Sequence, residues 1–321
     1  MRRDTPNWRP SASIEALQAR AELYGCVRAF FSARGVLEVD TPILSRHATV
    51  DRHIDSIATT DGRWLQTSPE FAMKRLLAAG SGPIWQIAKV FRAGEQGRYH
   101  NPEFSMLEWY RPGFDHHALM DELADLLAHC GIADTCERCS YREAFERHAG
   151  FDPLRADAAM LRARLRERGV DEPSGLSDAE IADEDFWLDL WMSCVVGPAL
   201  GADRPLFIYE FPASQAALAR VRAGEPPVAE RFELFWRGVE LANGFHELTD
   251  ADEQRRRFIG DQAWRAARGR VVPPFDAHLI DALRAGLPAC SGVALGLDRL
   301  LMLKLGASRL DQVLTFPVDR A

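Results

Sequence analysis

Residues 91–110 read F-R-A-G-E-Q-G-R-Y-H-N-P-E-F-S-M-L-E-W-Y. An apolar run over residues 84–92 leads into this stretch, and residues 93–102 form a polar loop that contains two glycines. Residues 103–111 are rich in aromatic and apolar side chains, which favour a second strand. The pattern predicts two antiparallel strands joined by a long loop.

The returning strand carries an acid on an otherwise apolar face. Side chains alternate along a strand, so Phe104, Met106, Glu108 and Tyr110 are expected to share one face. A carboxylate in such surroundings is costly unless it has a partner. Two interpretations of Glu108 remain open, namely an internal partner such as an arginine, and an ammonium ligand. Arg92, at the end of the first strand, offers a planar guanidinium that suits a phosphate.

A second pair of acids lies in residues 239–248, which read V-E-L-A-N-G-F-H-E-L. We expect Phe232–Leu241 to be a strand that continues beyond Asn243-Gly244. Glu240 and Glu247 are seven positions apart, so a regular strand would place them on opposite faces. A bulge at Asn243-Gly244 would correct the register. Two converging carboxylates would then suit Mg²⁺. Two exposed glutamates are the alternative.

A third segment, residues 291–303, reads S-G-V-A-L-G-L-D-R-L-L-M-L. It predicts a buried strand whose glycines, Gly292 and Gly296, allow a ligand to approach the backbone. Arg299 then enters a helix. Its side chain is suited to a terminal phosphate, and pairing with Asp298 or a role in packing is the equal alternative.

The remaining pattern alternates helical segments with strands joined as hairpins. This order predicts an α+β fold with an antiparallel sheet flanked by helices. Neither G-x-x-x-x-G-K-[ST] nor a strand-linked G-x-G-x-x-G is present. Any nucleotide must therefore be held by side chains and a sheet surface.

Composition limits the possible functions. The chain has 321 residues, of which 47% are hydrophobic and 27% charged, as in a soluble globular protein. No run approaches the roughly 18 apolar residues of a membrane span. The first six residues contain no apolar stretch, so we expect no secretory signal and a cytoplasmic location. A net charge of −8 lowers the expectation of nucleic-acid binding.

The six cysteines suggest reduced thiols in the cytosol. Cys136 and Cys139 are spaced as in zinc sites, and Cys130 is near in sequence. The second half of a four-ligand site is missing at ordinary spacing. Local packing and a metal both remain possible interpretations.

Taken together, the three segments resemble the motifs of class II aminoacyl-tRNA synthetases, and are most similar to those of the lysyl enzymes. Gly35–Pro42 resembles the first motif, which builds the dimer interface in that family. Residues 91–110 resemble the second motif, and Gly292–Leu303 the third. Within the family, the chain is similar to freestanding lysyl-synthetase paralogues that modify elongation factor P.

The resemblance implies an ATP-dependent ligase and a homodimer. It would activate lysine or (R)-β-lysine as the aminoacyl-adenylate and transfer it to a lysine side chain of elongation factor P. The alternative is a truncated lysyl-tRNA synthetase, or a paralogue that acylates tRNA or a small acceptor.

The resemblance also implies a role for each matching residue. Arg92 and Arg299 would be catalytic, holding the α- and γ-phosphates of ATP. Mg²⁺ would bind to Glu240 and Glu247. The other nucleotide contacts would be Gly94, Glu95, His100, Phe104, Glu240, Leu241 and Gly296.

For the amino acid, Ser68 and Glu70 would meet the backbone amine. Glu108 and Tyr110 would receive the side-chain ammonium. Glu247 and Ala294 would complete the pocket. An aspartate substrate would be repelled by these acids.

Two departures from the lysyl-tRNA synthetase pattern bear on function. The motifs begin close to residue 1, so residues 1–321 are expected to form a single catalytic domain without an anticodon-binding domain. Together with the acidic net charge, this makes tRNA an unlikely partner. The third motif has Ala294-Leu295-Gly296 where lysyl-tRNA synthetases carry Gly-x-Gly. The added methyl would reshape the amine end of the pocket and favour a lysine isomer such as β-lysine.

Overall fold

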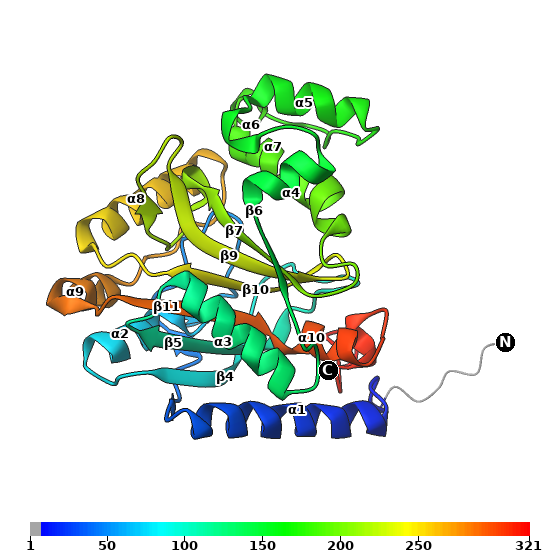
Figure 1. Ribbon diagram of the computed structural model, residues 1–321. Helices are drawn as coiled ribbons and strands as arrows, with labels where there is room; N and C mark the ends of the chain where they lie inside the picture. The colour runs from blue at the N-terminus through cyan, green and yellow to red at the C-terminus, as the bar shows by residue number, and fades with distance from the viewer. Residues whose placement is uncertain (1–7) are drawn as a thin grey trace. The chain divides into compact units, whose positions relative to one another are not determined.

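The protein is described by a computed structural model over residues 8–321, and the prediction about the first six residues lies outside this range. The chain divides into two compact units. Unit 1 contains the described chain up to Ile132 together with Glu247–Ala321, and unit 2 is Ala133–His246. In Figure 1 unit 2 is the green to yellow part of the ribbon. That residues 1–321 form a single catalytic domain stays a prediction.

The sheet of unit 1 contains the predicted hairpin. β4 (Ile84–Phe91) pairs antiparallel with β5 (Glu103–Pro112), which confirms the prediction from residues 84–111. β5 pairs antiparallel with β11 (Cys290–Gly296), and β1 (Leu37–Glu38) pairs parallel with β4. β2 (Leu44–Ser45) and β3 (Trp64–Leu65) form a separate small pair. The order β1-β4-β5-β11 places the second motif at the centre of these strands.

Two helices cover one face of this sheet. Phe31 in α1 (Ile14–Ala33) stacks on Trp85 of β4 with ring centroids 5.0 Å apart, and contacts Trp109 of β5 at 5.4 Å. The Trp109 indole donates to Glu122 of α3 (His116–His129) at 3.1 Å. The odd-numbered side chains of β4 and β5 therefore face α1 and α3, and the even-numbered side chains of β5 face away from them.

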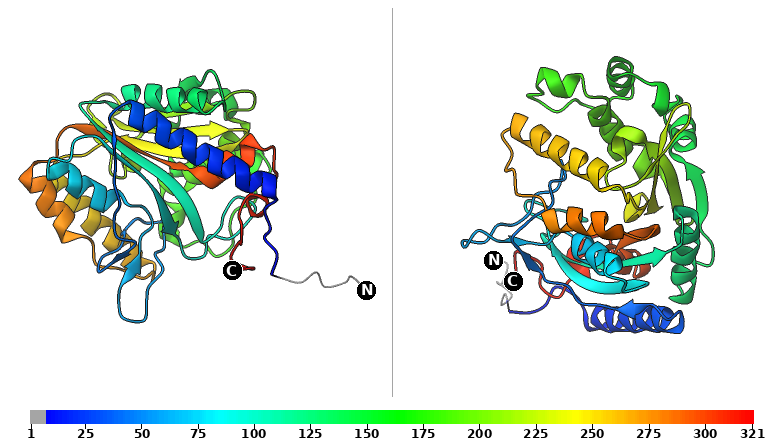
Figure 2. Two further views of the ribbon diagram at one scale, coloured as in Figure 1. Left: turned by 90° about the horizontal axis from the view of Figure 1, so that it is seen from below. Right: turned by 90° about the vertical axis from the view of Figure 1, so that its left-hand side faces the viewer.

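The other helices of unit 1 follow the remaining strands. α2 (Glu70–Ala78), α8 (Ala251–Ala267) and α9 (Ala277–Gly286) pack together, as the views in Figure 2 show. α10 (Leu297–Lys304) continues directly from β11. Asp298 fixes α10 to its surroundings, because it accepts a hydrogen bond from the Ser105 amide at 2.6 Å and pairs with Arg20 at 2.5 Å.

Unit 2 combines a mixed sheet with short helices. Its strands are β6 (Glu137–Ser140), β7 (Leu206–Pro212), β8 (Val221–Arg222), β9 (Val228–Trp236) and β10 (Val239–His246). Their order is β10-β9-β7-β6, and β8 pairs with β9. The helices are α4 (Tyr141–His148), α5 (Ala158–Glu167), α6 (Asp178–Ile181) and α7 (Glu184–Trp191). The fold class is thus α+β as predicted, with parallel pairing of β1 with β4 and of β6 with β7 beside antiparallel pairs among β4, β5, β7, β9, β10 and β11.

The predicted strand over 232–241 is wrong. The chain turns at Arg237-Gly238, where both residues have positive φ (51° and 72°), and β9 and β10 form a hairpin. Two successive residues with positive φ define the tight turn that matches strand twist. Arg-Gly is not one of the residue pairs that are typical of such a turn, so the sequence pattern did not predict it.

The predicted bulge at Asn243-Gly244 is also misplaced. The register between β9 and β10 shifts between Glu240 and Ala242, so Leu241 is the extra residue. Gly244 lies in regular strand and is required for a different reason. A Cβ atom there would lie 2.3 Å from the Phe232 ring.

None of the helices in residues 8–321 is both long enough and apolar enough to cross a membrane.

Candidate active site

The start of α2 is joined to the centre of β5. Pro69 is the N-cap residue, and the Ser68 hydroxyl accepts a hydrogen bond from the Glu70 amide at 3.0 Å. The same hydroxyl donates to Glu108 Oε2 at 2.8 Å. The start of α2 therefore also positions a side chain against the acid of the second motif.

Glu108 is buried, with 2% of its surface exposed. Its Oε1 accepts a hydrogen bond of 2.7 Å from the Tyr110 hydroxyl. Its hydrogen-bond partners are thus hydroxyl groups of Ser68 and Tyr110 rather than an arginine. Burial, followed by the negative charge of Glu70, raises the pKa of Glu108 to about 8, although the two hydroxyls and Lys74 oppose this shift. A cationic ligand would favour the ionised form.

A buried lysine lies between two of the predicted site acids. Lys74, 1% exposed, is 2.7 Å from Glu70 Oε1 and 2.6 Å from Glu247 Oε2 (both from Nζ). Burial lowers the pKa of Lys74, but the two carboxylates outweigh it and raise the pKa above the ordinary value. The sequence pattern missed this residue. Its i,i+4 spacing from Glu70 was visible, whereas its contact with Glu247 was not.

Glu247 is held by its backbone as well as by Lys74. Its amide donates to the Cys290 carbonyl at 3.0 Å, which places the residue beside the start of β11. Burial raises the pKa of Glu247, and the adjacent Lys74 ammonium opposes that change. Within residues 8–321, Glu247 Oε1 has no hydrogen-bond partner. One oxygen is therefore held by the lysine, and the other is suited to a further cation.

Gly292 allows the side chains of Tyr110 and Glu247 to lie against β11. A Cβ atom at this position would lie 2.2 Å from the Tyr110 ring and 2.7 Å from Glu247 Oε1. These separations are far below van der Waals contact. The glycine predicted to permit a close approach of a ligand thus permits, first of all, the approach of two site residues.

The sheet supplies the floor of the site. In the strand register Ala294 lies opposite Glu108, and Gly296 lies opposite Met106. The Ala294 methyl is therefore on the same face as the Glu108 carboxylate. This position fits the prediction that the methyl lies at the end of the site that receives the side-chain amine of the substrate. Phe104 and Ala294 pack against Met106 and its β4 neighbours. Phe104 is half-buried, so its ring is available to stack with a base.

Arg92 follows the end of β4. Its guanidinium lies over the Phe104 ring with Cζ 5.2 Å from the centroid, and Nη1 is 3.6 Å from Glu95 Oε1. In the described chain its buried Nε has no hydrogen-bond partner. Gly94 has φ of 76°, a value that favours glycine, and turns the loop beyond Arg92. Arg92 thus retains a buried donor for a phosphate oxygen.

Arg299 lies at the same edge of the sheet. Its Nε donates to the Tyr99 carbonyl at 3.1 Å, which joins α10 to the loop of the second motif. Asp298, the alternative partner proposed for Arg299, pairs with Arg20. β4 and β11 both pair antiparallel with β5, so they run in the same direction and end at one edge. Backbones two strands apart are separated by about 10 Å.

His100 lies in the second-motif loop, bridged to Gly97. The other two predicted nucleotide contacts belong to unit 2. Glu240 opposes Phe235 in the hairpin, and the buried Leu241 is the bulged residue. The predicted Mg²⁺ ligands Glu240 and Glu247 are thus assigned to different units, and their pairing stays a prediction.

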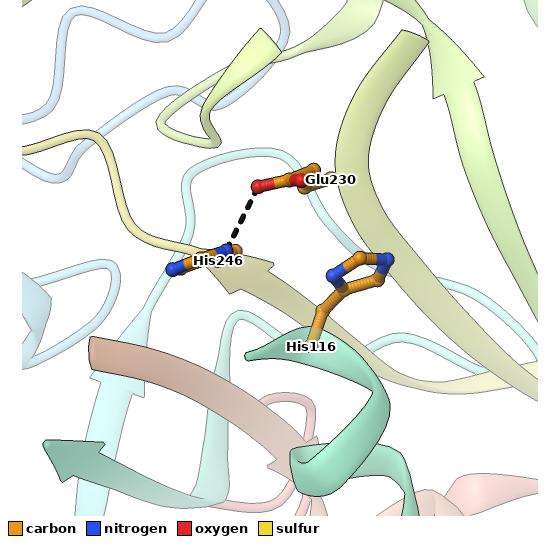
Figure 3. A group of neighbouring side chains, drawn as sticks. All are labelled: His116, Glu230 and His246. Carbon is orange, nitrogen blue, oxygen red and sulfur yellow. Dashed lines mark ion pairs between the residues drawn. The ribbon is translucent and has the colours of Figure 1, made fainter. Parts of the chain in front are cut away.

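Two sets of side chains outside this site are of the types that bind metals. In unit 2 His246 Nδ1 pairs with Glu230 Oε2 at 2.8 Å (Figure 3). Burial raises the pKa values of the Cys130, Cys136 and Cys139 thiols. None of these three cysteines belongs to a cluster of potential metal ligands among the described residues.

Residues 4–320 match the family model of tRNA synthetases class II (D, K and N). The chain belongs to this class II family. It is 50% identical to the elongation factor P--(R)-beta-lysine ligase of Salmonella arizonae over 99% of both chains. The proteins of the same name from Yersinia enterocolitica and Edwardsiella ictaluri are equally similar over the same share.

For this class II chain the second and third motifs are now located in space. Ser68, Glu70, Glu108, Tyr110, Glu247 and Ala294 come together in unit 1. Glu247 joins this group through Lys74, which the motifs did not identify.

Proposed function

We propose that this chain uses ATP to activate lysine or (R)-β-lysine as the aminoacyl-adenylate, and transfers it to a lysine side chain of elongation factor P. The observation that carries the proposal is the buried Glu108, whose carboxylate is held by hydroxyl groups on the sheet face beside Ala294. The family and the names of the 50% identical relatives support the same activity.

In the first step the amino-acid carboxylate attacks the α-phosphorus of ATP, and pyrophosphate leaves. Arg92 is suited to neutralise the α-phosphate, because its buried Nε lacks an internal partner among residues 8–321. Arg299, at the same sheet edge, is proposed to bind the γ-phosphate. Phe104 is proposed to stack on adenine, with Gly94, Glu95, His100, Leu241 and Gly296 as further contacts.

Mg²⁺ bound by Glu240 and Glu247 would offset charge on the phosphates. Glu247 fits this role with one oxygen, since Oε1 has no hydrogen-bond partner in the described chain, while Oε2 lies against Lys74.

In the second step an uncharged lysine amine of the acceptor attacks the adenylate carbonyl. A C–N amide bond forms, the C–O bond to the phosphate breaks, and AMP leaves while the amine loses a proton. We further propose that the enzyme is a cytoplasmic homodimer whose interface includes Gly35–Pro42, and that tRNA is not the acceptor.

Intact-mass spectrometry of elongation factor P tests the proposal. The factor is incubated with the enzyme, ATP, Mg²⁺ and either lysine or (R)-β-lysine. A mass increase of one lysyl group, lost when the acceptor lysine is changed to arginine, is expected. Acylation of tRNA without modification of the factor would instead favour a lysyl-tRNA synthetase activity, and absence of both products would contradict the proposal.

A further inference from the structure

Three carboxylates and one ammonium group lie together at the proposed amino-acid site of unit 1. Lys74 Nζ is 2.7 Å from Glu70 Oε1 and 2.6 Å from Glu247 Oε2. Glu108 lies near enough to interact electrostatically with both Glu70 and Lys74. The side chains of Lys74 and Glu247 are 2% and 1% exposed, so water screens this ion pair very little.

The lysine fixes the positions of the two acids. Neighbouring carboxylates in a buried space repel one another and turn apart unless a cation lies between them. Glu70 comes from the first turn of α2, and Glu247 from the segment beside β11, so no local geometry sets the distance between them. Lys74 contacts one oxygen of each and thereby leaves Glu247 Oε1 directed toward the site at Gly292.

Charge also favours a particular kind of substrate. When the three carboxyl groups are ionised, the form that a cationic ligand favours, one ammonium leaves two negative charges unmatched, and a diamino acid brings two ammonium groups. We infer that Lys74 is a positioning residue that determines specificity, because it holds Glu70 and Glu247 so that they and Glu108 receive a substrate with two ammonium groups. This inference rests on the proposed function.

The choice of lysine at this position is unusual for this chain. Of its 39 lysines and arginines, only three are lysines, namely Lys74, Lys89 and Lys304. The compact ammonium has three donors on a flexible stem, which suits a site enclosed by two acids. Lys89 offers a matched control, since it pairs with Glu103 at 3.3 Å but is 49% exposed.

The experiment measures binding without ATP or Mg²⁺, so that neither metal nor catalysis enters the result. Calorimetry gives Kd for lysine and (R)-β-lysine with wild type, Lys74→Met, Lys74→Arg and Lys89→Met. We expect Lys74→Met to raise Kd for both amino acids by at least about tenfold, as expected for the loss of one oriented charged partner. Lys74→Arg keeps the cation and should recover part of this loss, and Lys89→Met should bind as wild type does.

Separate titrations with ATP distinguish positioning from general loss of structure. We expect the ATP affinity of Lys74→Met to stay within about twofold of wild type, and KM for the amino acid to rise more than kcat falls. Unchanged amino-acid affinity, or a parallel loss of ATP affinity, would overturn the inference.

If Lys74→Met does not fold, Lys74→Arg decides. A folded Lys74→Arg that binds ATP and loses the amino acid completely contradicts a role for the cation, and one that binds both supports it. Failure of wild type to bind either amino acid would instead refute the proposed function, which keeps the two failures distinct.

Discussion

The Ser68 hydroxyl donates a hydrogen bond of 2.8 Å to Glu108 and accepts one of 3.0 Å from the Glu70 amide. One side chain therefore sets both the start of α2 and the orientation of the acid on β5. Since Tyr110 holds the other oxygen of Glu108, the carboxylate is oriented before any substrate arrives. Such preorganisation reduces the cost of binding.

Glu108→Gln should remove most of the preference for a cationic side chain. An ion pair near 4 Å is worth about 4 kcal/mol at an effective dielectric near 20, before desolvation is subtracted. Even half of this predicts a rise in KM for lysine of more than about tenfold, with little change for norleucine. ATP–pyrophosphate exchange measures KM for lysine and for norleucine. Glu103→Gln, on the same strand but exposed, is the control and should leave both values unchanged.

The stability of the ligand-free protein should fall as pH rises. Because the pKa of Glu108 is raised from 4.5 to about 8, its protonated form is favoured in the folded state. This contribution is complete below pH 4.5 and is lost as pH increases through about 8. Its size is on the order of 3–5 kcal/mol.

Unfolding by urea at several pH values between 5 and 9 tests this pH dependence. The free energy of unfolding of wild type should decline across the range, and Glu108→Gln should show a smaller decline. Equal slopes for the two proteins would show that Glu108 titrates normally.

Gly292→Ala should damage the pocket. The new methyl would lie 2.2 Å from the Tyr110 ring, so the ring must move and lose its hydrogen bond to Glu108. We expect a loss of about 1–3 kcal/mol in stability, together with a large rise in KM for the amino acid. Gly260→Ala is the control. A Cβ there meets nothing within 4 Å, so this helical substitution should stabilise the fold by about 0.5–1 kcal/mol. Thermal unfolding and exchange kinetics compare the two variants.

Ala294→Gly should change which lysine isomer is preferred. The Ala294 methyl stands opposite Glu108 in the register of β5 and β11. Removing it enlarges the amine end of the pocket, and a methyl group is worth about 1–3 kcal/mol of discrimination. The ratio of kcat/KM for (R)-β-lysine to that for lysine should fall by about tenfold or more. An unchanged ratio would place the determinant of the isomer elsewhere.

Much of the site was predictable because it depends on local rules. Alternation along a strand put Glu108 and Tyr110 on one face, and the structure confirms that these side chains meet. The polar loop before Glu103 predicted the hairpin of β4 and β5. The same rules did not predict the hairpin at Arg237-Gly238, because an arginine in a sequence does not indicate a residue with positive φ.

The sequence by itself determined the α+β class, the three motifs, and the acid on the central strand, since each follows from backbone periodicity over a few residues. Only the tertiary structure decided that Lys74 lies 2.6 Å from Glu247, that Gly292 makes room for Tyr110, and that Leu241 carries the bulge. These contacts join segments far apart in the chain or depend on which strand pairs with which. No short-range pattern encodes a distance between two side chains that meet only when separate elements pack.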